Sequence, residues 1–334
     1  MSKKSRVTIY DVASRANVSI ATVSRFLNTP ERVSVETKKR ILESIDELGF
    51  VPKASARALA RKQIGRIGVI TPFFTAASFV ERLRGISEAL VDTEYEFTIY
   101  PVDSLERLDG YYSTLPLNQN VDGLIIVSLP INESQAARLR QNQIPAVFIE
   151  NQVQGFSSIE IDDAFGGRLA AEHLLSQGHT NIAYLGDHGL PDYALQPESS
   201  RLDGFQHTLM QHGHPLRPEF IGETHYPPKN PDITILEILS NDHPPTAFFA
   251  ATDDLAMRIL KIANSQSIKI PEELAVVGFD DIPIAEYLDL TTISQSLYTS
   301  GRMAVRLLVE QMEDPSNPIH SINFQLKVIQ RGTA

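Results

Sequence analysis

The 334-residue sequence contains no cysteine, and no apolar run approaches the roughly 20 residues that a membrane-spanning helix needs. The absence of cysteine excludes disulfides, thiol catalysis and cysteine metal sites. The first ten residues, MSKKSRVTIY, are basic, but no apolar signal core follows them. We therefore expect a cytoplasmic, nucleoid-associated protein with no membrane partner, long enough for two or three domains.

The sequence also lacks the short motifs of common enzyme classes. There is no GxGxxG after a predicted strand, and no GxxxxGK[ST], GxSxG or HExxH. The nine histidines are scattered, and no acidic partner stands at metal-ligand spacing from them. We expect no catalytic residues, no metal and no cofactor, and hence a protein that is not an enzyme.

The net charge of −11 is divided unevenly along the chain. Residues 1–62 hold 13 basic and 6 acidic side chains, a net charge of +7, and the remaining residues hold 17 and 35, a net charge of −18. A small basic segment on a large acidic body confines attraction for phosphate to that segment. This division favours a nucleic-acid-binding head.

Residues 8–28, TIYDVASRANVSIATVSRFLN, predict two short amphipathic helices joined by a tight turn. Asn17 falls where the first helix must stop, because asparagine tolerates the left-handed conformation. Ser19 is placed as the N-cap of the second helix. The predicted apolar faces consist of Ile9, Val12, Ala13 and Ala16, and then of Val18, Val23, Phe26 and Leu27. This pattern is typical of a helix-turn-helix reader of the DNA major groove.

A third helix and a linker are predicted next. Ser34 begins the helix and Gly49 ends it, with an apolar stripe formed by Val35, Ile41, Ile45 and Leu48. After Pro52 the alanine-rich segment 54–61 favours a helix of only about two turns, which is unstable alone in water. Such a linker is a candidate for folding on DNA. The alternative is a plain linker in which Leu59 packs on the body.

From residue 64 the pattern changes to alternating strands and helices, which predicts parallel sheets covered by helices. Strands are predicted at RIGVIT, EFTIYPVD, VDGLIIVSL and IPAVFIE, and in a second series at NIAYLGD, TAFFAAT and LAVVGFD. A single last strand is predicted at INFQLKVIQR. Two similar halves indicate a bilobed α/β body with a ligand cleft at the carboxyl ends of its strands.

On these residues the chain resembles the lac/gal repressor family of bacterial transcription regulators. The resemblance is carried by residues 8–28, by GFVPKASARALA, and by VDGLIIV, RLAAEHLLSQGH, SRLDGF, ATDDLAM and VGFDD in the body. It implies a helix-turn-helix headpiece at residues 1–50, a hinge helix at 51–63 and a periplasmic-binding-protein-like body at 64–334. The N-lobe would hold about 64–163 plus 294–322, and the C-lobe about 164–293 plus 323–334.

The resemblance implies a set of DNA-contacting residues. Ile20, Ala21 and Arg25 would face base edges, with Arg25 as the candidate for a bidentate guanine contact. Leu59, beside Ala56 on the hinge, would wedge into the minor groove at the operator centre. Positions that would contact phosphates, or alternatively only cap helices, are Thr8, Ser19, Thr22, Ser24 and Asn28.

The resemblance also implies an effector site. Arg201 and Asp280 would anchor hydroxyls or a polar ring edge, and Tyr226 would stack on the effector. A structural ion pair is the alternative for Arg201 and Asp280, and Asp253 is expected to be a helix-start residue. Further cleft positions are Phe79, Glu150, Thr252 and Gln295. No contact is predicted within the proline-rich loop 187–200.

The sequence therefore predicts a repressor that binds a near-palindromic operator in double-stranded DNA as a homodimer. A small-molecule effector, expected to be a sugar or sugar derivative, would control it. A purine or nucleoside is the alternative effector, because Phe73, Phe74 and Phe79 offer stacking surfaces. A solute-binding transport protein is a remote alternative, since it would leave residues 1–62 unexplained. No amphipathic heptad segment is found near Ala334, so a dimer is expected.

Overall fold

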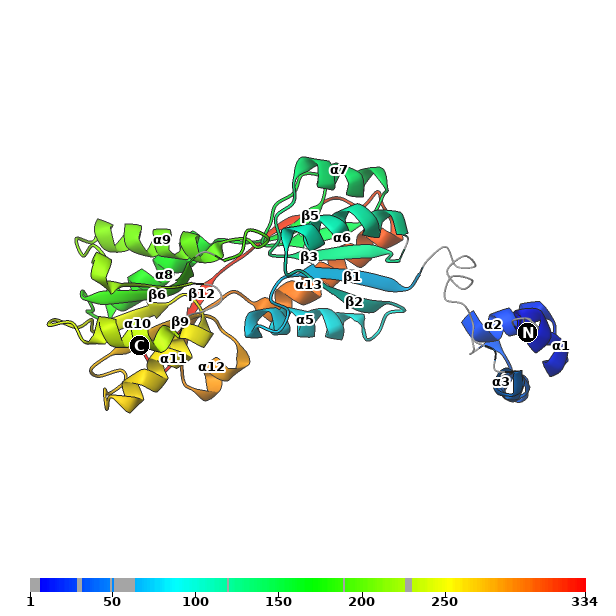
Figure 1. Cartoon of the computed structure of the whole chain (residues 1–334), viewed down its shortest axis with the longest axis horizontal. Coiled ribbons are helices and arrows are strands. Elements are labelled where there is room, and N and C mark those ends of the chain that lie inside the picture. Colours follow the sequence, from blue (N-terminus) through cyan, green and yellow to red (C-terminus); the bar gives the residue numbers. More distant parts are fainter. Residues whose placement is uncertain are drawn as a thin grey trace, which may run out of the picture. The chain divides into compact units, whose positions relative to one another are not determined.

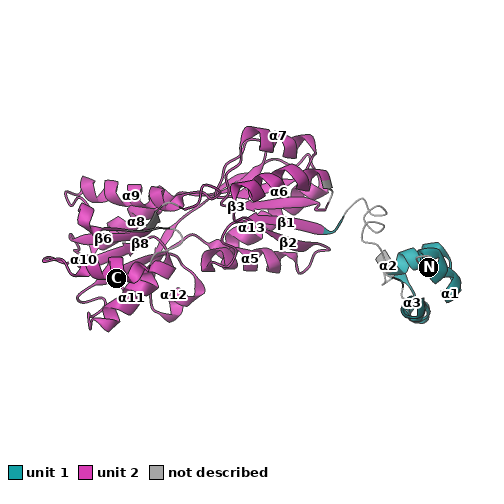
Figure 2. Ribbon diagram, in the orientation of Figure 1, with its two compact units in different colours: residues 1–65 teal, residues 66–334 magenta. Residues whose placement is uncertain are grey.

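The computed structural model describes residues 7–28, 32–48, 50, 64–118, 120–188, 190–225 and 230–334. The chain divides into two compact units, residues 1–65 and 66–334, which we call the headpiece and the body (Figure 2). Each is described by itself. The predicted hinge at 51–63, with Ala56 and Leu59, lies outside the described residues, as does Tyr226.

The headpiece consists of three helices, α1 (Ile9–Ala16), α2 (Ile20–Asn28) and α3 (Val35–Leu48). Asn17 ends α1 in the left-handed conformation, with φ 51° and ψ 51°. Val12, Val23 and Ile41 contribute one side chain from each helix to a fully buried core. The predicted helix pair and its turn are confirmed.

One prediction about the third helix was wrong. Val35 was expected in the apolar stripe, but it is 83% exposed at the first position of α3. The stripe begins instead nearly two turns later at Ile41, which is buried, and continues through Ile45 and Leu48. Val35 is exposed because it fits the 3.6-residue period of the stripe only loosely. The first turn of α3 also extends beyond the core that α1 and α2 provide.

The body contains two lobes, each a six-stranded sheet with helices on both faces (Figure 1). The first lobe comprises β1 (Arg66–Thr71), α5 (Ala77–Leu90), β2 (Glu96–Pro101), α6 (Leu105–Asn118), β3 (Gly123–Val127), α7 (Glu133–Gln141), β4 (Ala146–Ile149), β5 (Ser157–Ile161), α13 (Leu297–Glu313) and β11 (Ser321–Phe324). We call it the N-lobe.

The second lobe, or C-lobe, is built in the same way. It comprises α8 (Asp163–Ser176), β6 (Ile182–His188), α9 (Pro197–Gln211), β7 (Ile221–His225), α10 (Pro231–Leu239), β8 (Ala247–Ala250), α11 (Asp253–Ser265), β9 (Ala275–Asp280), α12 (Pro283–Tyr287), β10 (Thr291–Ser294) and β12 (Lys327–Ile329). Its buried strands are rich in valine, alanine and phenylalanine, as expected for a sheet covered on both faces.

The two sheets share one strand order. They run β11-β5-β4-β3-β1-β2 and β12-β10-β9-β8-β6-β7, and every neighbouring pair is parallel except β10 with β12. In each sheet the direction in which successive strands are added reverses at the first strand, between β1 and β3 and between β6 and β8. Ligands of such sheets bind beyond the carboxyl ends of the strands at this reversal. The predicted bilobed α/β fold is confirmed.

The end of the chain differs from the prediction. The single strand predicted at 322–331 is two short strands, because β11 belongs to the N-lobe sheet and β12 to the C-lobe sheet. The segment therefore crosses between the lobes at Gln325 and Leu326. Strand β5 was not predicted, although Ser157–Ile161 pairs with both β4 and β11. No helix in the described part of the chain is long and apolar enough to cross a membrane.

Close helix packing fixes one arginine in each lobe. A Cβ on Gly301 of α13 would lie 2.1 Å from the carbonyl oxygen of Arg82 on α5. A Cβ on Gly167 of α8 would lie 1.9 Å from the carbonyl oxygen of Arg201 on α9. Only glycine permits this approach of two helix backbones. Arg82 and Arg201 therefore project from equally rigid positions in the two lobes.

Candidate functional site

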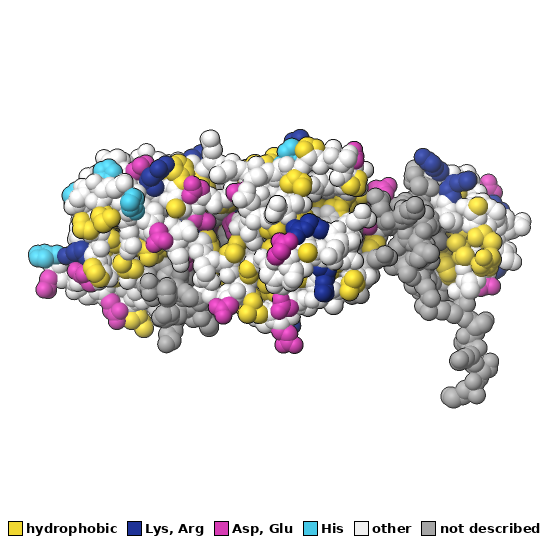
Figure 3. All heavy atoms as spheres, turned by 90° about the horizontal axis from the view of Figure 1, so that it is seen from above, with side chains coloured by type: hydrophobic (Ala, Val, Ile, Leu, Met, Phe, Trp, Pro, Cys, Tyr) yellow, Lys and Arg dark blue, Asp and Glu magenta, His cyan; other side chains and the backbone are white. Residues whose placement is uncertain are grey.

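In the headpiece, α2 turns part of its surface to solvent. Ile20, Ala21 and Arg25 are exposed, whereas Val23 between them is fully buried. Figure 3 shows lysine and arginine side chains gathered along one edge of the headpiece, near a patch of hydrophobic side chains. An exposed helix face beside cations is the arrangement that enters a major groove.

The polar residues flanking α1 and α2 cap these helices. The Ser19 hydroxyl accepts a hydrogen bond from the Thr22 backbone N–H at 3.1 Å. The Thr8 hydroxyl donates to Asp11 at 2.7 Å, and this hydrogen bond holds the pKa of Asp11 below its usual value. Ser24 is half-buried, and the side chain of Asn28 lies outside the described part. Contact of these residues with phosphate stays a prediction.

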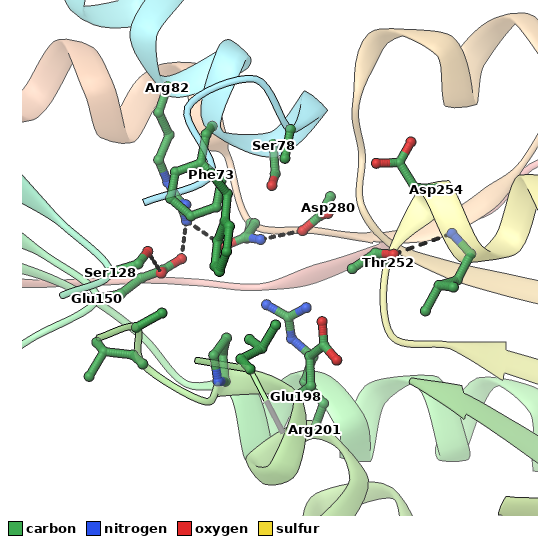
Figure 4. Close-up of a pocket in the computed structure, with 18 of the residues that line it drawn as sticks. Phe73, Ser78, Arg82, Ser128, Glu150, Glu198, Arg201, Thr252, Asp254 and Asp280 are labelled. Carbon is green, nitrogen blue, oxygen red and sulfur yellow. Dashed lines mark hydrogen bonds and ion pairs between the residues drawn. The ribbon is translucent and has the colours of Figure 1, made fainter. Parts of the chain in front are cut away.

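In the body, a cavity of about 690 Å³ lies at the carboxyl ends of both sheets (Figure 4). N-lobe residues that follow β1, β3 and β4 line it, together with C-lobe residues that follow β6, β8 and β9. Figure 4 shows Phe73, Ser78 and Arg82 on one side of the cavity and Glu198 and Arg201 on the opposite side.

The N-lobe wall holds a buried ion pair. Arg82, whose side chain is 3% exposed, pairs with Glu150 just after β4. The Ser128 hydroxyl donates to the same carboxylate. Burial would raise the pKa of Glu150, but the charge of Arg82 and the Ser128 hydrogen bond outweigh it, so this pKa is lowered. Nε of Arg82 is buried without a partner in the described structure.

Gln295 connects this wall to the C-lobe. It lies where the chain passes from β10 to α13 and is 2% exposed. Its side-chain oxygen accepts from Nη2 of Arg82 at 2.9 Å, and its amide nitrogen donates to Oδ1 of Asp280. The amide orientation is thereby fixed by a cation on one side and a carboxyl group on the other.

Arg201 is the corresponding arginine of the C-lobe. Its Nε donates to Asp163 at 2.8 Å, its Nη1 donates to the carbonyl oxygen of Ala251 at 2.7 Å, and its guanidinium stacks 3.7 Å from the ring centre of Phe279. Nη2 donates to no partner within the described ranges. Arg201 does not pair with Asp280, so the structural ion pair considered from the sequence does not form. A donor from a rigid, buried cation thus faces the cavity.

Asp280 offers the complementary acceptor. It ends β9 and is 6% exposed. Burial raises the pKa of Asp280 to about 7, although the charge of Arg201 and the hydrogen bond from Gln295 oppose this shift. Asp253 lies behind it and accepts from the Ile282 N–H at 2.9 Å and from the Thr292 hydroxyl. Asp253 is therefore a buried structural residue that begins α11, as predicted.

Several residues of the cavity wall hold unusual backbone conformations. The φ angles of Phe73, Ser128, Glu150 and Asp280 are 41°, 53°, 65° and 117°. Positive φ values in residues other than glycine persist only where the surrounding structure enforces them, and they concentrate at binding sites. Strained positions in the cavity wall are consistent with a binding site, although other residues such as Gln143 and Ser267 hold positive φ values away from the cavity.

Six of the seven predicted effector residues line this cavity, and Tyr226, the seventh, lies outside the described residues. The six are Phe79, Glu150, Arg201, Thr252, Asp280 and Gln295. Thr252 also caps α11 by accepting from the Leu255 N–H at 3.3 Å. Phe74, considered as a stacking residue, is 40% exposed and does not line the cavity. Contact of any of these residues with an effector remains a prediction.

Sequence reasoning missed two parts of the wall. Arg82 shares one face of α5 with Phe79, Ile86 and Leu90, so a charged residue in an apolar stripe was a signal that went unused. Loop 187–200 was given no contact, yet Leu190, Ala194, Leu195, Pro197 and Glu198 line the cavity. No group of three or more histidine or acidic side chains in the described part could hold a metal ion.

Comparison with known proteins gives the family. Residues 8–53 match the model of bacterial regulatory proteins of the lacI family, and residues 171–334 match that of a periplasmic binding protein-like domain. The chain is 33% identical to catabolite control protein A of Priestia megaterium over 313 residues, which cover 92% of both chains.

Two solved structures extend this likeness. One is the lac repressor dimer bound to operator and the anti-inducer ONPF, with 26% identity, a TM-score of 0.74 and coverage of 98% of this chain and 99% of that chain. The other is a LacI-family regulator from Enterococcus faecium with bound ribose, with 25% identity, a TM-score of 0.68 and coverage of 80% and 98%. The chain thus belongs to the lacI family of bacterial transcription regulators, which combine a DNA-binding headpiece with an effector-binding body.

Proposed function

We propose that this regulator is a repressor that binds its operator as a homodimer and is controlled by an effector in the cavity between the lobes. It acts on the chromosome in the cytoplasm. The observation that carries the proposal is the cavity, in which Arg201 presents a donor and Asp280 an acceptor from buried, rigid positions. We propose no catalytic role for these residues.

On DNA, the exposed face of α2 supplies the specific contacts. Ile20 and Ala21 offer apolar contact to a thymine methyl, and Arg25 donates to a guanine edge. Thr8, Ser19, Thr22, Ser24 and Asn28 contact phosphates in addition to their local roles. The linker, with Ala56 and Leu59, folds in the minor groove between two half-sites and kinks it.

Replacement of Arg25 tests the DNA contact. Arg25→Ala should weaken binding to an operator selected from randomised DNA by roughly 1–3 kcal/mol. Binding to unrelated DNA should fall much less, because phosphate contacts carry no sequence information. Fluorescence anisotropy at fixed salt measures both affinities. An equal loss on both DNAs would assign Arg25 to the backbone and remove it from base recognition.

The effector is proposed to be a sugar or sugar derivative. Arg201 and Asp280 suit a hydroxyl that both donates and accepts, and paired charges on both walls suit a neutral, polyhydroxylated molecule. The ribose-bound Enterococcus faecium regulator supports this choice. A purine or nucleoside is the alternative, favoured by the adjacent rings of Phe73 and Phe79, whose centres lie 6.0 Å apart in the cavity wall.

Control requires only that the effector bind one arrangement of the lobes more tightly than the other. A thermal-shift screen of sugars, sugar phosphates and nucleobases identifies it, because a ligand at 100 times its Kd adds about 2.7 kcal/mol of stability. Operator anisotropy is then measured with and without that ligand. If a bound ligand leaves operator affinity unchanged, allosteric control by this cavity is wrong.

A further inference from the structure

We propose that residues 190–196, LPDYALQ, form an apolar subsite of the cavity that selects glycosides with a planar apolar group over the bare sugar. We call this segment the strap. The inference rests on the proposed function of the cavity as a sugar site and assigns its ligand class more narrowly. It concerns the loop for which the sequence predicted no contact.

The strap has a structure of its own between β6 and α9. The Ala194 N–H donates to the Pro191 carbonyl at 2.8 Å, which closes a turn. The Gln196 side-chain amide donates to the carbonyls of Leu190 at 2.9 Å and Ala194 at 3.4 Å. These hydrogen bonds give partners to backbone groups within the strap and fix its conformation, so the strap can present a defined wall to a ligand.

The strap leaves the C-lobe and contacts the N-lobe. The Leu195 N–H donates to the carbonyl oxygen of Ser128 at 3.1 Å. Tyr193 is partly buried and packs against the N-lobe core. Ser128 also donates to Glu150, so the strap lies directly beside the polar wall of the cavity. A ligand that fills this region meets both surfaces at once.

The surface that the strap adds to the cavity is apolar. Leu190, Ala194 and Leu195 line it, next to Phe73 and Phe79. The ring of Phe73 lies 6.1 Å from that of Tyr193 and 6.0 Å from that of Phe79, so it is held between the strap and α5. Phe73 keeps this place with φ at 41°, which is costly for a bulky residue. A wall of this kind gains little from hydroxyls and favours a flat apolar group.

The size of the cavity agrees with a ligand of two parts. Its volume of about 690 Å³ falls within the roughly 300–1,000 Å³ of sites for drug-sized ligands. Arg201, Asp280 and Glu150 supply polar partners for a sugar ring, and the strap with Phe73 supplies the apolar remainder. A nucleoside or an aryl glycoside carries both parts.

Calorimetric titration of the full-length protein with matched glycosides tests the subsite. The probes are the methyl and phenyl β-glycosides of glucose, galactose and ribose. For a sugar that binds, the phenyl glycoside should bind at least about tenfold more tightly than the methyl glycoside, because its ring leaves water. In Leu195→Ser this ratio should fall to near one, while the methyl glycoside keeps its affinity within about twofold.

Leu105→Ser is the matched control, because Leu105 is a half-exposed leucine at the start of α6 that does not line the cavity. It should keep the full phenyl-to-methyl ratio. Leu190→Ser replaces Leu195→Ser if thermal melting shows that the latter does not fold. If the phenyl glycoside binds no more tightly than the methyl glycoside, or if its advantage in affinity is the same in the strap variant, the proposed subsite is wrong and the proposed sugar site still stands. Binding of none of the six glycosides overturns both.

Discussion

The two walls of the cavity carry the same kind of residues and use them differently. Each wall presents an arginine whose side chain is 3% or 4% exposed, fixed by a glycine contact between two helices. In the N-lobe, Glu150 accepts from both Arg82 and Ser128, and its pKa is lowered. In the C-lobe, Asp280 accepts only from Gln295 among the described residues, and its pKa is raised.

This difference separates a carboxylate that is paired within its own wall from one that is not. Glu150 pairs with Arg82, although Nε of Arg82 is buried without a partner in the described structure. Arg201 and Asp280 do not pair, and each keeps hydrogen-bonding capacity toward the cavity. We therefore propose that the C-lobe wall provides the anchoring contacts and that the N-lobe wall provides a fixed surface against which the effector is held.

The largest expected effect comes from removing either arginine. Arg82→Met and Arg201→Met should each lower the free energy of unfolding by about 3–5 kcal/mol, because each leaves a buried carboxylate without its cation. Urea denaturation of the folded dimer at pH 7 measures both losses.

Paired replacements then distinguish the two walls. Arg82→Met with Glu150→Gln should recover most of the loss, since an ion pair exchanged for neutral groups is often tolerated. Arg201→Met with Asp163→Asn should recover less, because the Ala251 carbonyl loses its donor and Asp280 its neighbouring charge. Equal recovery in the two double variants would mean that the walls do not differ in the way described.

A smaller effect is expected from Asp280→Asn and depends on pH. Because burial raises the pKa of Asp280 to about 7, the folded protein binds a proton that the unfolded chain has released. The wild-type free energy of unfolding should therefore fall as pH rises from 5.5 to 8, while the variant escapes this contribution. From pH 5.5 to pH 8, the free energy of unfolding of Asp280→Asn minus that of the wild type should rise by up to about 2 kcal/mol.

Urea unfolding of both proteins at pH 5.5 and pH 8 measures this change. The two proteins share every other titratable group, so the contributions of those groups cancel in the difference. A difference that is independent of pH would show that Asp280 titrates as an ordinary carboxyl group. Glu150 should add no such change between pH 5.5 and pH 8, because its pKa is lowered from the usual 4.5 and its contribution to stability is lost only as pH falls below that value.

The smallest expected effect concerns Ser128. Ser128→Ala removes the hydroxyl that donates to Glu150 and should cost about 1 kcal/mol of unfolding free energy. Ser78→Ala is the control, because Ser78 lines the same cavity without a hydrogen bond in the described structure. A loss of the same size in both variants would mean that the Ser128 hydrogen bond contributes nothing of its own.

Much of this architecture was predictable from the sequence. The period of apolar residues gave the helix pair around Asn17 and the strand–helix alternation of the body, because a buried face constrains residue type strongly. The end of the chain was misassigned because Ser321–Ile329 reads as one alternating segment, and only the tertiary structure divides it between two sheets. Val35 was misplaced because periodicity does not show where a neighbouring helix ends.

The candidate site was predictable where residues stand at strand ends. Thr252 and Asp280 follow or end buried strands, so the sheet order brings them together. Arg82 and the strap escaped prediction for different reasons. Arg82 lies on a helix, where a buried cation is unexpected without its partner in view. The strap has no period, and its contact with Ser128 joins residues 67 positions apart.

We propose that the effector acts on DNA binding through Arg201. The most direct test measures operator affinity by anisotropy for the wild type and for Arg201→Lys, with and without the ligand found by thermal shift. Lysine keeps the charge beside Asp163 but loses the planar fork. We expect at least about a fivefold effector-dependent change in operator Kd for the wild type and none for Arg201→Lys, with equal affinities in the absence of effector. An unchanged effector response in Arg201→Lys would contradict it.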